Sequence, residues 1–185
     1  MRSIGNKTLF SLAFLTGMCA VLGAAAYYRP PALPAVNTLA LTKDVFVSEQ
    51  VLPEALPALK RKGFATLIDL RPDGEAEDQP SAARMQSAAR ASRIAFAYVP
   101  VARGDIEPAT VDALAQALAS TPRPVLLYCR SGRRAARTWS LVEASRPGGL
   151  DAVGILSAVK AAGQSSEDLS GEIAKRVAHR ARANR

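Results

Sequence analysis

Apolar positions near the start of the chain form one uninterrupted run. Residues 8–28 read TLFSLAFLTGMCAVLGAAAYY and contain no charged side chain. As a helix, this run is about 31 Å long at about 1.5 Å per residue, which is enough to cross the hydrocarbon core of a bilayer. We therefore predict an N-terminal transmembrane helix within residues 1–28. The alternative is a cleaved signal peptide, because the small residues Ala24–Ala26 fit a signal-peptidase site.

Charges around this run predict its orientation. Arg2, Lys7 and the amino terminus precede the run, and positive charge favours the cytoplasmic side. Under either interpretation, the rest of the chain is expected outside the cytoplasm, in the periplasm. Residues 29–42 begin with the proline-rich stretch RPPALPAV and are interpreted as an extended linker.

Beyond the linker, short apolar runs of strand length alternate with longer stretches of helical periodicity. Strands are predicted at Asp44–Val51, Phe64–Leu70, Ile94–Val101 and Arg123–Cys129. Helices are predicted at residues 53–63, 79–92, 107–120, 135–145, 154–163 and 171–185. This alternation favours parallel pairing and predicts an α/β domain, a parallel sheet flanked by helices, over residues 43–172. Residues 173–185 are interpreted as a basic C-terminal tail.

Composition narrows the classes of partner. The formal net charge is +8, which is compatible with nucleic acid, an acidic membrane surface or a small anionic ligand. No zinc finger, stacking aromatic set or recognition-helix signature accompanies this charge, so we expect no nucleic-acid partner. The chain has two cysteines, of which Cys19 lies in the apolar run, and one histidine, His179. We therefore expect no disulfide framework, no cysteine–histidine dyad, no metal site and no cofactor.

The stretch YCRSGRRAA, residues 128–136, joins a predicted strand to a predicted helix. Ligands of open α/β sheets bind at the carboxyl ends of strands, and amide N–H groups at the start of a helix attract anions. Gly132 permits a tight turn there. The same positive field stabilises the thiolate form of Cys129, and an arginine fork can hold a phosphate or sulfur oxyanion.

A simpler interpretation is an inert buried cysteine beside solvated arginines. Four arginines at the start of a helix, however, oppose its dipole and indicate a compensating anion: Arg130, Arg133, Arg134 and Arg137. We therefore favour an anion-binding loop with Cys129 as a nucleophile.

Three stretches carry a more specific resemblance: residues 45–80 (VFVSEQVLPEALPALKRKGFATLIDLRPDGEAEDQP), 96–108 (FAYVPVARGDIEP) and 124–139 (PVLLYCRSGRRAARTW). Residues 161–173 (AAGQSSEDLSGEI) add a weaker similarity. With these stretches, residues 43–172 resemble the phosphatase-like family of beta-lactamase hydrolase-like proteins. The resemblance implies the fold of cysteine-dependent protein phosphatases and hydrolysis of a phosphate monoester through a phosphocysteine.

The resemblance also implies roles for individual residues. Cys129 is expected to be the nucleophile and Arg134 the oxyanion clamp of a phosphate-binding loop. The loop residues between them are expected to bind the anion: Arg130, Ser131, Gly132 and Arg133. Asp105 is expected to be the general acid that protonates the leaving oxygen. A helix-cap role for Asp105 is the alternative, and Asp73 and Glu75 are weaker candidates for the acid.

Asp69 and Arg71 end the strand that is expected beside the loop. We expect them to brace the loop by a salt bridge.

The loop departs from the usual phosphatase signature. That signature has five residues between cysteine and arginine, whereas four separate Cys129 from Arg134, and Ala135 occupies the expected arginine position. Tyr128 replaces the usual histidine. A four-residue spacing resembles the loop of rhodanese-type sulfurtransferases, a label that the family has also received. Sulfur transfer through a Cys129 persulfide is therefore the alternative function, and a non-catalytic anion-binding module is the second alternative.

Overall fold

The computed structural model describes residues 35–183. They belong to one compact unit, Leu33–Arg185, and the two hydrophobic clusters of the described residues lie within it. The predicted membrane segment at residues 1–28 lies outside the described residues. Within residues 35–183, every helix is too short or too polar to span a bilayer.

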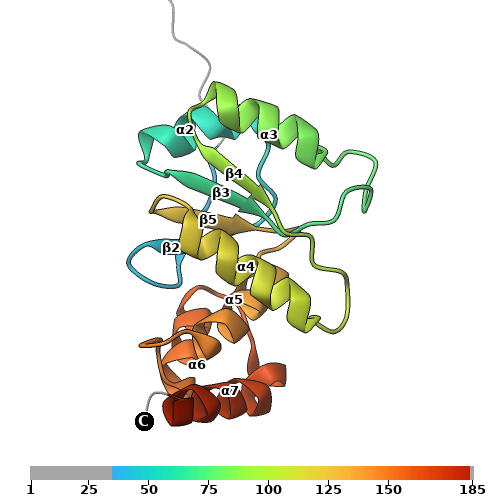
Figure 1. The fold of residues 1–185 in the computed structure, drawn as a ribbon. Helices are drawn as coiled ribbons and strands as arrows, with labels where there is room; N and C mark the ends of the chain where they lie inside the picture. Colours follow the sequence, from blue (N-terminus) through green and yellow to red (C-terminus); the bar gives the residue numbers. More distant parts are fainter. Residues whose placement is uncertain (1–34, 184–185) are drawn as a thin grey trace, which may run out of the picture. The chain divides into compact units, whose positions relative to one another are not determined.

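A five-stranded sheet forms the centre of the domain (Figure 1). Its strands are β1 (Leu39–Ala40), β2 (Val45–Ser48), β3 (Thr66–Asp69), β4 (Ala95–Tyr98) and β5 (Val125–Tyr128). The spatial order is β1-β2-β5-β3-β4, in which β1 is antiparallel to β2 and the other neighbours are parallel. This arrangement places β5 between two parallel neighbours and confirms the predicted α/β architecture.

Alternation along β5 divides the core into two layers, because successive side chains of a strand point to opposite faces. Leu126 and Tyr128 join the cluster under η1 (Pro53–Ala55), α2 (Leu56–Arg61) and α3 (Ala82–Ala91). Leu127 and Cys129 join the larger cluster under α4 (Pro108–Ser120) and α5 (Arg133–Ser145). Figure 1 shows these two layers above and below the sheet.

Local sequence explains where the helices begin. Pro57, which is unfavourable inside a helix, falls in the first turn of α2 because the preceding turn is the separate 3-10 element η1. Ser81 accepts a hydrogen bond from the amide of Arg84 and caps α3. Asp151 accepts one from the amide of Gly154 and caps α6 (Ala152–Ala161).

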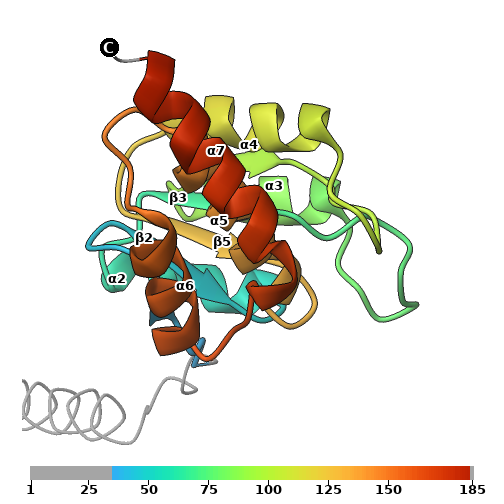
Figure 2. The same cartoon turned by 90° about the horizontal axis from the view of Figure 1, so that it is seen from below.

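The C-terminal segment differs from the expected separate tail. After η2 (Glu167–Leu169), α7 (Ser170–Ala183) continues through residue 173 and packs against α5 (Figure 2). Ile173 is fully buried in the main core. At the other end, β1 lies inside the segment that was expected to be linker. The folded domain is therefore longer at both ends than the predicted 43–172.

Candidate active site

The loop that follows β5 leads directly into α5. Cys129 follows the last residue of the strand, and Gly132 is the N-cap residue of the helix with φ of 83°. A Cβ atom at Gly132 would lie 2.9 Å from Gln164 Nε2 and 3.2 Å from the Ser48 carbonyl oxygen. The predicted need for glycine at the turn therefore has two physical reasons, a left-handed backbone and close neighbours.

Carbonyl groups of the loop are held away from its concave side. The amide of Gln50 donates to the Arg130 carbonyl at 3.3 Å, and Gln164 Nε2 donates to the Ser131 carbonyl at 3.1 Å. The amides of residues 130–134 have no acceptor among residues 35–183. A run of unpaired N–H groups at the positive end of a helix is a site for an oxyanion.

Cys129 lies at the inner end of this loop. Its side chain is 1% exposed and not in a disulfide, and it belongs to the apolar cluster beneath α5. Only a reagent or substrate that enters the loop can therefore reach the sulfur atom.

Arg134, the last residue of the loop, forms a bidentate ion pair with Glu75. Its Nη1 and Nη2 donate to the two carboxylate oxygens of Glu75, both at 2.7 Å, and Nη1 also donates to the Val101 carbonyl at 2.7 Å. The hydrogen bonds that Arg134 donates to Glu75 raise the pKa of Arg134, and the charge of the nearby Cys129 sulfur adds to this effect. Arg134 is thus held in place by the segments that follow β3 and β4, which lie on the same side of β5 in the sheet.

The geometry leaves Arg134 with donors to spare. A guanidinium has five N–H groups, and three are used by Glu75 and Val101. Nε–H and the second Nη2–H lie together on one edge of the plane, and no oxygen acceptor among the described residues takes them, while the Cys129 sulfur lies close to the guanidinium. This free edge is the part of Arg134 that can bind an oxyanion bidentately.

Glu75 is a positioning residue and not the acid that the sequence left open. Arg134 lowers the pKa of Glu75 to about 2, with Arg71 and Arg103 contributing. Arg71 Nε lies 3.2 Å and Arg103 Nε 3.6 Å from its carboxylate. A carboxyl group this acidic cannot hold a proton for a leaving group near neutral pH. Asp73 is also engaged, since it accepts from the amide of Ala82 at 2.8 Å.

A cavity of about 450 Å³ opens above the loop. It is lined by Ser131 and Gly104, by Asp105, and by five arginines: Arg103, Arg130, Arg133, Arg134 and Arg137. The structure thus brings Asp105, on the segment after β4, to the rim of the cavity formed by the cysteine loop. Five cations face one carboxylate there, so the cavity strongly favours an anionic occupant.

Arg137 connects this rim to the C-terminal part of the domain. Its Nη2 donates to Asp168 at 2.5 Å, and Nη1 approaches the Gly104 carbonyl at 3.5 Å. Asp168 was not among the predicted site residues. No local motif marks it, because η2 reaches the site only through tertiary packing.

Asp69 and Arg71 do not form the predicted salt bridge to the loop. Asp69 accepts from the backbone amide of Arg71 at 2.8 Å. Arg71 Nη1 donates to Gln50 Oε1 at 2.8 Å, and the Gln50 amide holds the Arg130 carbonyl. Arg71 therefore braces the loop indirectly, through Gln50 and through Glu75.

Tyr128 and Asp69 form a buried polar pair on the opposite face of β5 from Cys129. Burial raises the pKa of Asp69 to about 6, and the nearby Tyr128 hydroxyl and Arg71 amide oppose this rise. Burial also raises the pKa of Tyr128, and the charge of Asp69 adds to it. The Tyr128 hydroxyl has no hydrogen-bond partner in the described part of the chain.

Residues 35–183 contain no cluster of three or more histidine, cysteine or acidic side chains arranged to hold a metal ion. The donors at the site are amides and guanidinium groups, which bind anions.

Comparison with known proteins gives the site a context. Residues 37–146 match the family described as beta-lactamase hydrolase-like protein, phosphatase-like domain. A beta-lactamase hydrolase-like protein of Xylella fastidiosa is 41% identical over 83 residues, which are 45% of this chain and 19% of that protein. One from Agrobacterium fabrum is 30% identical over 109 residues, 59% of this chain and 25% of that protein. The match thus spans a quarter or less of these longer relatives.

Solved structures share the architecture. A candidate phosphatase from Neisseria meningitidis superimposes with a TM-score of 0.66 at 27% identity, covering 75% of this chain and 96% of that one. A kinase associated phosphatase with its catalytic-site cysteine replaced by serine gives 0.62 at 11% identity, covering 80% and 98%. Tk-PTP in its active form gives 0.58 at 13%, covering 77% and 97%. At 11% and 13% identity, the last two establish a shared fold.

Proposed function

Because this chain belongs to the phosphatase-like domain family of beta-lactamase hydrolase-like proteins, we propose that it hydrolyses a phosphate monoester through a phosphocysteine at Cys129. The observation that carries this proposal is the unpaired amide run of residues 130–134 beside the free edge of Arg134. Together they offer donors to the equatorial oxygens of a phosphoryl group whose phosphorus faces the sulfur atom.

In the first step, the Cys129 thiolate attacks phosphorus while the bond from phosphorus to the leaving oxygen breaks. The leaving oxygen takes the proton of Asp105, which lines the same cavity. General-acid help of this kind contributes about 10²–10⁴-fold. Arg134 and the loop amides stabilise the charge that develops on the transferred phosphoryl group.

In the second step, a water molecule attacks the phosphocysteine. The Asp105 carboxylate accepts one proton from this water, the S–P bond breaks, and the Cys129 thiolate and inorganic phosphate are restored. Asp105 is then protonated again and ready for the next turnover. No metal or other cofactor takes part in either step.

Charge around the cavity suggests the class of substrate. Arg130 and Arg133 line the cavity but form no ion pair within residues 35–183. A substrate that carries further anionic groups beside the reacting phosphate can engage them. We therefore expect substrates with two or more anionic groups to be preferred over a simple aryl phosphate.

Sulfur transfer is the second candidate, and the loop length is the observation that favours it. Four residues separate Cys129 from Arg134, and the smaller ring suits a single sulfur atom. Here the Cys129 thiolate would take the sulfane sulfur of thiosulfate and release sulfite. Cyanide would then take that sulfur from the persulfide, giving thiocyanate and restoring the thiolate. This route needs no general acid, so it leaves Asp105 without a role.

Parallel assays test the two functions. The purified protein is expected to hydrolyse p-nitrophenyl phosphate slowly, with inhibition by vanadate, and to transfer sulfur from thiosulfate to cyanide more weakly. Cys129→Ser should abolish either activity while the circular dichroism spectrum is unchanged. Ready sulfur transfer without phosphate release would establish the second candidate, and retention of anion binding with neither activity would indicate a non-catalytic module.

We also propose that residues 1–28 anchor the domain in a membrane with the catalytic part in the periplasm. The support is the uncharged run of residues 8–28 behind Arg2 and Lys7. Alkaline phosphatase, which is active only outside the cytoplasm, should be active when it is fused after Arg185. Activity of a second reporter that works only in the cytoplasm, fused at the same position, would contradict this topology. A mature protein that lacks residues 8–26 by mass would indicate a cleaved signal peptide instead.

A further inference from the structure

A second cavity lies at the amino ends of the parallel strands, opposite the carboxyl ends that carry the cysteine loop. Its volume is about 540 Å³, which is within the range of small-molecule sites. Thr42, Lys43 and Asp44 border it just before β2, and Arg123 does so just before β5. These positions are at the amino ends of parallel strands, whereas Cys129 lies at a carboxyl end.

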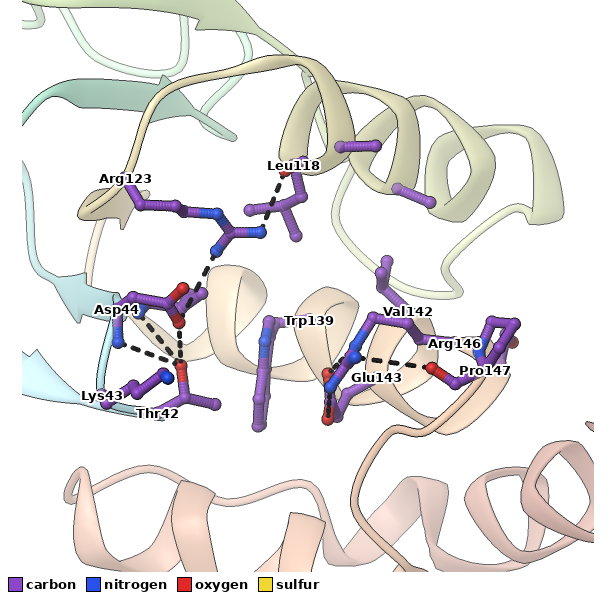
Figure 3. Close-up of a pocket in the computed structure, with 14 residues that line it drawn as sticks. Thr42, Lys43, Asp44, Leu118, Arg123, Trp139, Val142, Glu143, Arg146 and Pro147 are labelled. Atoms are coloured by element: carbon purple, nitrogen blue, oxygen red, sulfur yellow. Dashed lines mark hydrogen bonds and ion pairs between the residues drawn. The ribbon is translucent and has the colours of Figure 1, made fainter.

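The floor of this cavity is apolar. Leu118 of α4 and Trp139 and Val142 of α5 are all nearly fully buried and line it. Figure 3 shows Trp139 standing between two charged groups, with Lys43, Asp44 and Arg123 on one side and Glu143 and Arg146 on the other. A molecule that enters the cavity thus meets an apolar surface beneath a charged rim.

The rim carries more unused donors than acceptors. Glu143 accepts from Arg146 Nε at 2.9 Å and Nη2 at 2.7 Å, and from the Leu150 amide at 2.9 Å. Asp44 accepts from the Thr42 hydroxyl at 2.9 Å and faces Arg123 Nη1 at 3.9 Å. Lys43, in contrast, makes no hydrogen bond or ion pair within the described residues.

The carboxylates are thus largely occupied by the protein, whereas the Lys43 ammonium group is not. Three cations on the rim face two carboxylates: Lys43, Arg123 and Arg146 against Asp44 and Glu143. The next polar group to enter should therefore be an acceptor with negative charge.

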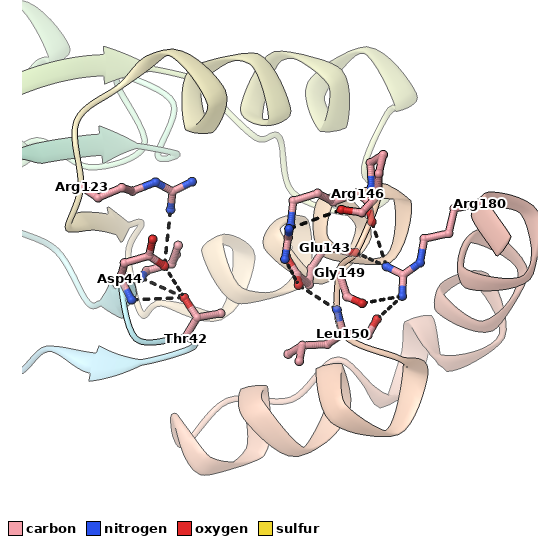
Figure 4. A network of polar contacts seen from close by, with 10 residues as sticks. Thr42, Asp44, Arg123, Glu143, Arg146, Gly149, Leu150 and Arg180 are labelled. Carbon is pink, nitrogen blue, oxygen red and sulfur yellow. Dashed lines mark hydrogen bonds and ion pairs between the residues drawn. The ribbon is translucent and has the colours of Figure 1, made fainter. Parts of the chain in front are cut away.

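The wall at the far side of the cavity is fixed from outside. Arg180 of α7 donates to the carbonyl oxygens of Glu143, Arg146, Gly149 and Leu150 (Figure 4). These bonds add a side-chain donor to carbonyls at and just after the end of α5, of which those of Glu143 and Arg146 also accept from backbone amides. They tie down the turn that carries Arg146, so the cavity is built by the folded domain before any ligand arrives.

From these contacts we propose that this cavity binds a small molecule that joins an apolar body to one anionic group. The apolar body contacts Leu118, Trp139 and Val142, and the anionic group pairs with Lys43 and Arg123. This site is separate from the cysteine loop, and its occupancy does not depend on the reaction proposed there.

Trp139 provides the readout, because it is the single tryptophan of the chain and it lines the cavity. The full chain in phospholipid vesicles would be titrated with three water-soluble probes that share one body: 4-phenylbutanoate, 4-phenylbutanol and 4-phenylbutylamine. We expect a saturable change in Trp139 emission with the carboxylate, about tenfold weaker affinity for the alcohol, and no saturation with the amine.

Two variants locate the binding. Lys43→Met should weaken 4-phenylbutanoate binding about five- to tenfold, whereas the matched control Lys60→Met, on exposed α2, should leave it unchanged. Ala115→Leu, which fills the cavity from α4, should abolish binding and preserve the thermal unfolding transition.

Several results would overturn the proposal. Equal affinity for the three probes means that the cavity does not select an anion, and unchanged binding in Lys43→Met and Ala115→Leu places the probe elsewhere. Binding by a chain that starts at Leu33, but not by the full chain, means that the preceding segment occupies the cavity. If the affinity for the probe decreases as the protein concentration is raised, a second copy of the chain covers the cavity.

Discussion

Glu75→Gln is the most informative single change at the site. It keeps the size of the side chain and removes the charge that holds Arg134, whose Nη1 and Nη2 lie 2.7 Å from the two carboxylate oxygens. Glu75 is 11% exposed, and Arg71 and Arg103 approach the same carboxylate. The change therefore leaves three arginines facing a neutral amide.

The magnitude follows from the pKa of Glu75, which is lowered from 4.5 to about 2. A shift of about 2.5 units corresponds to about 3.4 kcal/mol as an upper bound, at about 1.36 kcal/mol per unit. The adjoining cavity is open to solvent and Arg103 is 66% exposed, so screening reduces this value. We expect Glu75→Gln to lower the free energy of unfolding by about 1–2 kcal/mol at pH 7.

The pH dependence has a definite sign. Because the folded-state pKa is below the unfolded value, the stabilisation by Glu75 is present above about pH 4.5 and is lost as the pH falls toward about 2. Urea unfolding of the wild type and Glu75→Gln should therefore differ at pH 7 and converge in acid. Glu77→Gln, at an exposed position of the same segment, is the matched control.

Activity should follow the same logic. A guanidinium released from Glu75 can rotate away from the loop, so we expect kcat/KM for p-nitrophenyl phosphate to fall about tenfold or more, which is about 1.4 kcal/mol of transition-state binding. If Glu75→Gln is as stable as the wild type at pH 7, or if the stability difference is constant from pH 7 to pH 3, the Glu75 carboxylate does not stabilise the fold through Arg134.

Three further predictions concern neighbouring groups. Asp105→Asn should slow hydrolysis of an alkyl phosphate about 10²-fold or more but slow that of p-nitrophenyl phosphate much less, because a good leaving group needs no proton. If steady-state assays show the same loss of rate on both substrates, Asp105 is a structural residue. The pKa of Asp69 is raised from 3.8 to about 6, so the stabilisation that its protonated carboxyl group contributes is full below about pH 3.8 and is lost as the pH rises through 6. Asp69→Asn should remove this loss, which amounts to up to about 3 kcal/mol of unfolding free energy. Urea unfolding between pH 4 and 7 measures it, and a pH profile equal to that of the wild type would contradict the prediction. Gly132→Ala should destabilise by about 1–2 kcal/mol, because φ is 83°, whereas Gly171→Ala, in open space on α7, should not; thermal unfolding of both variants decides.

Periodicity alone predicted the central strands and the helices that cover them. The run PVLLY and the spacing of apolar residues after Cys129 locate β5 and α5 within a few residues of their observed bounds. These elements are predictable because each presents a continuous apolar face to the core. β1 escaped prediction because two residues have no pattern, and its pairing with β2 is set by the tertiary fold.

The loop could be predicted as a candidate anion-binding site for a similar local reason. A cysteine, a turn glycine and arginines between a strand and a helix are all visible within residues 128–136. The roles of Glu75, Gln164 and Asp168 could not be predicted, because each acts across the fold. Glu75 stands 59 residues before Arg134 in sequence, and nothing near it distinguishes a clamp for arginine from a general acid.

The second cavity was also outside the reach of sequence analysis. Its charged residues come from the turn before β2, the start of β5 and the end of α5. Each of these charges is ordinary in its own segment, and only the packing of α4 and α5 brings them around Trp139.

The covalent state of Cys129 during turnover decides whether hydrolysis passes through a phosphocysteine. Asp105→Asn, which lacks the carboxylate that accepts a proton from water in the second step, would be mixed with p-nitrophenyl phosphate, quenched rapidly in denaturant at alkaline pH and digested for peptide mass spectrometry. We predict the mass of one added phosphoryl group on the peptide that contains Cys129, and no such adduct in Cys129→Ser. An unmodified Cys129 after phosphate ester, together with one added sulfur atom after thiosulfate, would contradict the account.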